Sequence, residues 1–226
     1  MVAIINKPAP QPELECWVQG SEPPISELTG QVILIEMIQV NCPGCFIHAL
    51  PEVIRLHQTY ESQGLKVFAI ATAFEHFEQN TLKNLQRLLQ HGELTGDPLS
   101  QLGKAGFLDN ASGALKLPYT IPFSVAMDKL VKNENAVDET AIEQFILEQI
   151  PDFQQRDWDE QRRQSIYRQA ENHLKNKQYH ARTFEMYQLQ GTPSSILIDK
   201  KGLLRKISFG AVSTLEADIQ QLLNES

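Results

Sequence analysis

The chain has 226 residues, of which 42% are hydrophobic and 21% charged, and these fractions exclude collagen-like, disordered and coiled-coil proteins. With 20 basic and 28 acidic residues the formal net charge is −8, which disfavours nucleic acid as a partner. Three cysteines are too few for a disulfide-stapled scaffold, and no apolar run reaches the ~20 residues of a membrane span. The start of the sequence shows no secretory signal, so we expect a cytoplasmic protein, or a periplasmic one if a leader precedes this sequence.

The first third of the chain carries strand, helix and strand signals. Residues 14–18 have a strand-like pattern, and residues 31–40 (QVILIEMIQV) are almost continuously apolar, which predicts a central buried strand. Pro43 suits the first turn of a helix, and apolar residues then recur at helical spacing until a glycine ends the helix. Residues 65–72 (LKVFAIAT) repeat the buried-strand pattern, so we expect a parallel crossover and an α/β fold.

The remaining signals complete a sheet with its helices. In chain order the patterns predict an amphipathic helix over residues 81–91, a loop over 92–118, a strand over 121–128 and a β-hairpin over 195–209. Ser213 and Glu216 have the spacing of a capping box, which predicts the start of a final helix.

One segment is not needed for this sheet. We expect residues 132–183 to form a helical insertion in a domain made of residues 1–131 and 184–226. Asp138 is placed to cap a first helix, and a second, longer helix is predicted over residues 157–184. Acidic residues precede basic ones along this segment, which is typical of a solvated helical face, with a docking surface as the alternative.

Three aromatic residues of the insertion, Trp158, Tyr167 and Tyr179, are expected to be exposed. Aromatic side chains supply large contact area with little conformational entropy to lose. The insertion is therefore a candidate for selecting a protein substrate or for forming a homodimer, without a part in electron transfer.

The motif Cys42-Pro43-Gly44-Cys45 lies where the first predicted helix begins. Unpaired backbone N–H groups and the positive end of the helix dipole favour a thiolate there, so Cys42 is the candidate nucleophile. Cys45 lies one turn further along and is the candidate resolving thiol. No second cysteine pair or spaced histidine pair completes a zinc site, so we expect no metal, and Cys16 is interpreted as a small buried hydrophobe.

Glu36 interrupts the buried strand and needs an explanation. A carboxylate in such a position costs several kcal/mol unless it is protonated, paired or used. It precedes Cys42 by six residues, which can place it beneath the helix that carries both cysteines. A carboxyl of raised pKa there could exchange a proton with Cys45; an ion pair or a solvated edge is the alternative.

Taken together, these motifs resemble the thioredoxin fold, and specifically the TlpA-like redoxins with their extra strand, here residues 121–128. The resemblance is carried by the strand QVILIEMIQV, the Cys42–Cys45 motif, the strand LKVFAIAT, and Gly191-Thr192-Pro193 before the hairpin SSILIDKKG, and it covers residues 10–131 and 184–226. It implies a mixed sheet flanked by helices, a cis peptide bond at Pro193 beside the cysteine pair, and Glu36 at the position of the buried acid. We assign substrate binding to Pro43, Gly44, Thr192 and Pro193.

The predicted function is that of a thiol-disulfide oxidoreductase that needs no organic cofactor and is reset by an external dithiol partner. Its substrates would be disulfides of proteins or small molecules. A redox-regulated interaction module is the alternative from another class. A thiol peroxidase is a weaker alternative, because peroxiredoxins have Thr or Ser three residues before the reactive cysteine and Gln39 stands there. Asn41 also replaces the tryptophan that usually precedes the first cysteine of the family.

Overall fold

The protein is seen in a computed structural model that describes residues 2–96, 102, 106–107, 115–134, 137–211 and 213–225. Much of the loop expected over residues 92–118 therefore lies outside the described residues. The chain divides into two compact units, Met1–Leu130 with Ala181–Ser226, and Val131–His180. None of the helices in the described ranges is long and apolar enough to cross a membrane.

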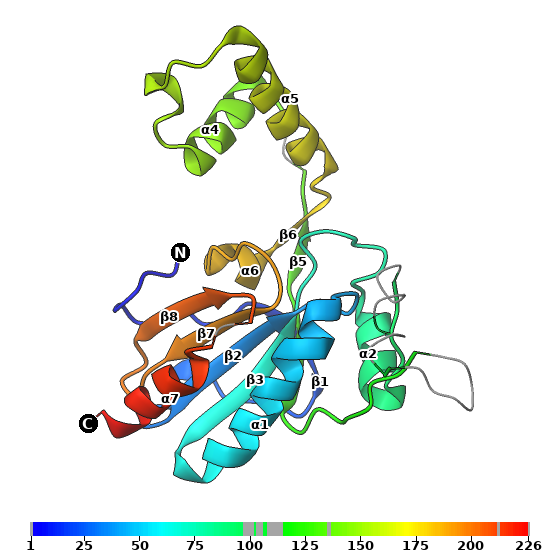
Figure 1. Ribbon diagram of the computed structural model, residues 1–226, viewed down its shortest axis with the longest axis vertical. Helices are drawn as coiled ribbons and strands as arrows, with labels where there is room; N and C mark the ends of the chain where they lie inside the picture. Colours follow the sequence, from blue (N-terminus) through cyan, green and yellow to red (C-terminus); the bar gives the residue numbers. More distant parts are fainter. Residues whose placement is uncertain are drawn as a thin grey trace. The chain divides into compact units, whose positions relative to one another are not determined.

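The larger unit is built on a six-stranded mixed sheet in the order β1-β4-β3-β2-β7-β8 (Figure 1). Its strands are β1 (Leu14–Gln19), β2 (Val32–Ile38), β3 (Leu65–Ala71), β4 (Ser124–Asp128), β7 (Ser194–Ile198) and β8 (Leu204–Phe209). The strand β2 is parallel to β3 and antiparallel to β7, and β3 is parallel to β4. The outer strands β1 and β8 run antiparallel to their neighbours. All seven residues of β2 are buried, so the predicted central strand and the α/β class are confirmed.

Helices cover both faces of this sheet because side chains alternate along each strand. They are α1 (Leu50–Tyr60), α2 (Leu82–His91), α6 (Arg182–Met186) and α7 (Leu215–Asn224), with short 3₁₀ turns at Ile25–Glu27 and Glu61–Gln63. Leu34 and Ile38 of β2 pack in one core cluster with α1, α2 and α7, whereas Ile33 and Ile35 pack in the other with α6. In Figure 1, α1 and α7 lie across the front of the strands.

The start of α7 differs from the expected capping box. Its N-cap is Thr214, which makes no side-chain cap hydrogen bond. Glu216 instead accepts two hydrogen bonds from Arg55 of α1, at 3.2 and 2.8 Å, and one from the hydroxyl of Tyr60 at 2.7 Å. The capping-box prediction with Ser213 is wrong because a guanidinium on the neighbouring helix takes the carboxylate.

The smaller unit contains α4 (Glu139–Gln149), a 3₁₀ turn (Phe153–Gln155) and α5 (Glu160–Asn176). The chain enters it through β5 (Leu130–Lys132) and leaves through β6 (Tyr179–Ala181), and these two strands pair with each other. Asp138 caps α4 as predicted, accepting the N–H of Ala141 at 2.8 Å. The prediction of one helix over 157–184 is wrong, because pairing with β5 ends the helical conformation and α6 belongs to the larger unit.

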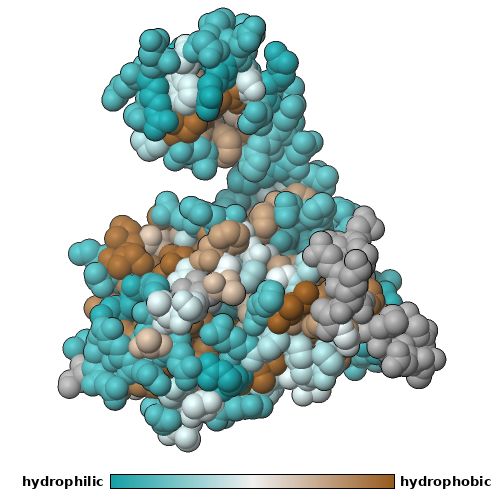
Figure 2. Space-filling model, viewed as in Figure 1, coloured by the Kyte–Doolittle hydropathy of each residue, from teal (hydrophilic) through white to brown (hydrophobic). Residues whose placement is uncertain are grey.

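The aromatic side chains of the smaller unit form its core. Only Ile146, Phe153 and Ala170 are buried in the hydrophobic cluster described for this unit. Trp158 and Tyr167 pack on Phe153 with ring centroids 5.8 and 5.9 Å away. The prediction that these aromatics and Tyr179 are exposed is wrong, since all three are half-buried. On the face shown in Figure 2 the rest of this unit is mostly hydrophilic.

Candidate active site

Cys42 and Cys45 lie just beyond the carboxyl end of β2, where the chain turns into the helix that continues as α1. Both are free thiols; Cys45 is fully buried and Cys42 is half-buried. The N–H of Cys45 donates to the sulfur of Cys42 at 3.2 Å. The thiol of Cys42 also lies 3.6 Å from the carbonyl oxygen of Thr192, to which it donates.

The surroundings of Cys42 favour its thiolate. Its hydrogen bond with the Cys45 thiol, together with the N–H groups of Cys45 and Gly44 and the side chain of Thr192, lowers the pKa of Cys42 to about 7, against the opposing effect of burial. Hydrogen bonds to a sulfur stabilise its charged form, which is why the accessible thiol is the more acidic one. A large fraction of Cys42 is therefore ionised at neutral pH.

The environment of Cys45 has the opposite effect. Burial raises the pKa of Cys45 well above its ordinary value, and the neighbouring charges of Cys42 and Glu36 raise it further. At neutral pH Cys45 is therefore a thiol, while a large fraction of Cys42 is a thiolate. Two sulfurs three residues apart are thus divided into one that can attack and one that must lose a proton before it reacts.

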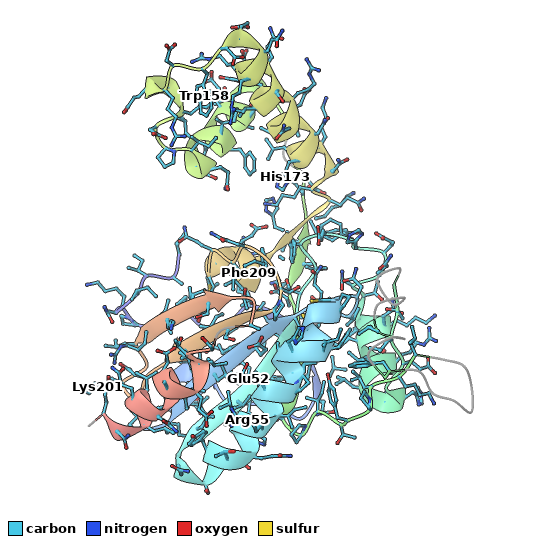
Figure 3. All side chains as sticks on the ribbon, in the orientation of Figure 1. Glu52, Arg55, Trp158, His173, Lys201 and Phe209 are labelled. Carbon is cyan, nitrogen blue, oxygen red and sulfur yellow. The ribbon has the colours of Figure 1, made fainter. Side chains whose placement is uncertain are left out.

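Glu36 occupies the middle of β2, with Ala69 of β3 and Ser195 of β7 as its register partners. It shares the strand face of Leu34 and Ile38, which is the face covered by α1. Burial raises the pKa of Glu36 to about 8, so the carboxyl is mostly protonated at neutral pH. The carboxylate of Glu52, which lies on α1 (Figure 3), also raises the pKa of Glu36.

The loop before β7 borders the cysteine pair. The peptide bond between Thr192 and Pro193 is cis, as the resemblance implies. A Cβ atom added to Gly44 would lie 3.6 Å from Cδ of Pro193, so the backbone of the motif packs against the proline ring. The structure thus brings Gly44, Thr192 and Pro193 together beside Cys42, while half-buried Pro43 lies in the first helical turn.

Gln39 is a site residue that sequence reasoning did not identify. Its buried side chain accepts the hydroxyl of Thr192 at 3.1 Å and donates to the carbonyl of Glu75 at 3.2 Å. The backbone carbonyl of Gln39 also accepts the N–H of Cys42 at 3.2 Å. Gln39 therefore ties the end of β2 to the Thr192–Pro193 loop; the available signal was an uncharged polar residue at the end of a buried strand.

Tyr119 is the second unidentified residue, and the helix explains its position. Residues Cys45–Ala49 form a π turn, in which the N–H of Leu50 donates to the carbonyl of Cys45. The next carbonyl, that of Phe46, would need the N–H of Pro51, which proline lacks. The hydroxyl of Tyr119 donates to it at 2.6 Å instead. Burial, and then the charge of Cys45, raise the pKa of Tyr119.

No site in the described ranges groups three or more His, Cys, Asp or Glu side chains in a way that could hold a metal ion. The chemistry that this arrangement supports by itself is nucleophilic attack by one sulfur and proton transfer at the other.

Comparisons with known proteins show the fold of the larger unit. No family model matches the sequence, and no curated protein sequence matches it. Among solved structures, a thioredoxin-like superfamily protein is 24% identical with a TM-score of 0.58, over 97% of each chain. A thiol-disulfide isomerase from Corynebacterium glutamicum is 21% identical with a TM-score of 0.59, over 98% of each chain. The chain therefore has a thioredoxin-like fold.

Proposed function

We propose that this protein is a thiol-disulfide oxidoreductase in which Cys42 attacks and Cys45 resolves. The observation that carries the proposal is a cysteine pair beside the Thr192–Pro193 loop in which half-buried Cys42 accepts the N–H of Cys45 and Cys45 is fully buried. The opposite directions of the two thiol pKa shifts agree with this division. The fold shared with a protein named as a thiol-disulfide isomerase supports the same chemistry. A protein disulfide is the expected substrate class.

The reaction balances over two exchange steps. The Cys42 thiolate attacks one sulfur of a substrate disulfide, the substrate S–S bond breaks, and the departing sulfur takes a proton. In the fraction of molecules whose Glu36 is ionised, the Cys45 thiol then gives its proton to that carboxylate, and its sulfur attacks Cys42. The bond between Cys42 and the substrate breaks, so the substrate gains two electrons and the protein holds a Cys42–Cys45 disulfide. An external dithiol returns the pair to its reduced form.

The residues around Cys42 suit binding of the substrate. Thr192, Pro193 and Gly44 border the attacking sulfur, and Pro43 stands in the adjacent helical turn. Gln39 holds the side chain of Thr192 and thereby fixes the loop that a substrate chain would meet. We propose that Pro43, Gly44, Thr192 and Pro193 form the surface that contacts the substrate.

A trapping experiment tests this assignment. Cys45→Ser should accumulate a mixed disulfide between Cys42 and a model protein disulfide such as insulin, and the wild-type protein should reduce insulin catalytically with dithiothreitol. Cys42→Ser should do neither, and Cys16→Ser, the matched control, should behave as wild type. Absence of turnover in the wild-type protein would contradict the proposal and favour a redox-regulated interaction module. Catalytic consumption of peroxide without disulfide reduction would favour a thiol peroxidase.

A further inference from the structure

The hydroxyl of Ser195 contacts the buried acid directly. Ser195 is the register partner of Glu36 on the neighbouring antiparallel strand β7. Its Oγ donates to Oε2 of Glu36 at 2.7 Å, and both side chains are buried. The other carboxyl oxygen, Oε1, is also buried and has no hydrogen-bond partner among the described residues.

This hydrogen bond makes the two oxygens of Glu36 chemically different. When Glu36 is a carboxylate, the oxygen that already accepts the hydroxyl of Ser195 is the poorer acceptor of a further proton, and Oε1 is the better one. The strand face of Glu36 is covered by the helix that holds Cys45, and the charges of Glu36 and Cys45 interact. The free oxygen is therefore the one left to exchange a proton with the inner thiol.

The groups around Glu36 act on its charge in opposite directions. Burial is the largest effect and disfavours the carboxylate, as do the charges of Glu52 on α1 and of Cys42. The hydroxyl of Ser195 favours the carboxylate. Ser195 thus keeps the acid within reach of neutral pH, where it must alternate between carboxylate and carboxylic acid to serve as a base.

We propose that Ser195 is a positioning residue for proton transfer between Cys45 and Glu36: it holds Oε2, so that Oε1 takes and returns the proton. In the resolving step the proton leaves Cys45 Sγ for Oε1, and the electron pair left on sulfur forms the Cys42–Cys45 bond. The inference rests on the proposed function, because it describes a step of that reaction.

Valine and threonine at position 195 provide a matched pair, since they have the same shape and differ by the hydroxyl. The measurement is the single-turnover rate at which Cys45 resolves a preformed mixed disulfide at Cys42, followed by stopped flow from pH 6 to 10. A hydrogen bond to a charged group contributes enough to move the pKa by about one unit, so Ser195→Val should shift the pH profile upward by about one unit and slow resolution about tenfold at pH 7. Ser195→Thr should keep the wild-type profile. In a Glu36→Gln background, neither change should have a further effect.

A second readout does not depend on turnover. In reduced protein with ¹³C-labelled glutamate, the titration of the Glu36 carboxyl should move upward in Ser195→Val and stay in place in Ser195→Thr. An unchanged titration and pH profile in folded Ser195→Val would overturn the inference. It would also be overturned if Ser195→Val slowed resolution as much in the Glu36→Gln background as in the wild-type background. If the valine variant does not fold, Ser195→Ala replaces it, and a wild-type Glu36 titrating near its ordinary value would overturn the inference without any variant. Failure of the proposed function is distinct, since the wild-type protein would then not resolve the mixed disulfide at all.

Discussion

Among the described residues only the larger unit buries polar side chains, although both units carry exposed ion pairs. In the described residues, every buried polar side chain lies in the larger unit, and most of them lie in a strand or close to a strand end: Glu36, Gln39, Asn41, Thr72, Asn80, Asp128, Thr183, Ser194, Ser195 and Asp199. The smaller unit relies on exposed ion pairs one helical turn apart, such as Arg156 with Asp152 and Lys175 with Glu171. Solvent screens an exposed pair of this kind, so it contributes little to stability, whereas a buried polar group that loses its partner costs about 1–3 kcal/mol.

This contrast shows where the chemistry of the molecule is fixed. In the larger unit, strand pairing fixes Glu36, and hydrogen bonds to Thr192 hold Gln39 and Cys42. The neighbours of each residue therefore set its pKa or its contacts. In the smaller unit the described ion pairs are exposed, and a small core of three buried side chains, with partly buried apolar neighbours such as Trp158, holds the helices together. We expect substitutions in the larger unit to alter reactivity, and comparable substitutions in the smaller unit to alter only local stability.

The largest expected effect is the pH dependence that Glu36 gives to stability. Its pKa is about 8 in the folded protein and 4.5 in the unfolded chain, so the folded state binds the extra proton. The contribution is fully present below pH 4.5 and is lost as pH rises to 8, by roughly 5 kcal/mol in total. Urea unfolding of reduced protein at pH 5 and at pH 8.5 should show that the wild type loses roughly 4 kcal/mol more stability between these pH values than Glu36→Gln does. The ionisation of Cys42, whose pKa is about 7, acts in the opposite direction but equally in both proteins. The control is Asp152→Asn, which should keep the wild-type pH dependence. The hydrogen bond and salt bridge with Arg156 hold the pKa of Asp152 below its usual value, so this carboxyl does not titrate in the pH range of the experiment.

A pair of phenylalanine truncations tests the division between the units. Phe46 is fully buried next to Cys45, and Phe153 is the largest buried side chain in the core cluster of the smaller unit. Each change to alanine removes about 3–5 kcal/mol locally. Phe153→Ala should unfold the smaller unit, seen as lost helical circular dichroism, while the alkylation rate of Cys42 stays at the wild-type value. Phe46→Ala should change that rate; equal effects of the two variants on Cys42 would contradict the comparison.

Removing a tyrosine hydroxyl from each unit gives a smaller contrast. Tyr119→Phe leaves the carbonyl of Phe46 without its donor, which should lower the free energy of unfolding by about 1–3 kcal/mol and speed amide exchange in the π turn. The matched control is Tyr167→Phe, whose hydroxyl donates to Glu143 at the surface of the smaller unit. Its effect should stay within about 0.5 kcal/mol. If Tyr167→Phe were as destabilised as Tyr119→Phe, the difference in burial between the two hydroxyls would not explain their contributions to stability.

The smallest expected effect follows from removing the smaller unit altogether. The N–H of Arg182 donates to the carbonyl of Lys129 at 2.9 Å, so the chain leaves and re-enters the larger unit at one place. A short Gly/Ser linker in place of residues 131–180 should therefore leave the reduction potential of the cysteine pair within ~30 mV of wild type. Reactivity toward small disulfides should persist, and activity toward a protein partner should fall. A shift beyond that limit, or failure to fold, would make this segment part of the core or of the site.

The parts of the molecule that could be predicted from sequence are those with a local signal. The apolar run of β2, the turn before β8 and the Cys42–Cys45 spacing each report on neighbouring residues, and the strand, the hairpin and the helix start are where they predict. The cis bond before Pro193 followed only from the family resemblance, because Thr192-Pro193 has no distinguishing local pattern.

The parts that could not be predicted depend on contacts between distant segments. Tyr119 reaches Phe46 across 73 residues, and Ser195 reaches Glu36 across 159, with no pattern that links either pair in the sequence. The same limit explains the wrong end of the second insertion helix, because the charged, helix-favouring run continues past the point at which β6 pairs with β5. Local preference identified the elements, and tertiary pairing decided where they stop.

The most direct test of the account is the pH dependence of alkylation at Cys42 and Cys45 in the reduced, folded protein. Iodoacetamide labelling over short times, read by peptide mass spectrometry, reports the thiolate fraction of each sulfur separately. We predict that labelling of Cys42 rises with a midpoint near pH 7, and that Cys45 stays unlabelled until well above pH 9. Equal rates at the two cysteines, or a Cys42 midpoint near the ordinary value of a free thiol, would contradict the division of roles on which the proposed function rests.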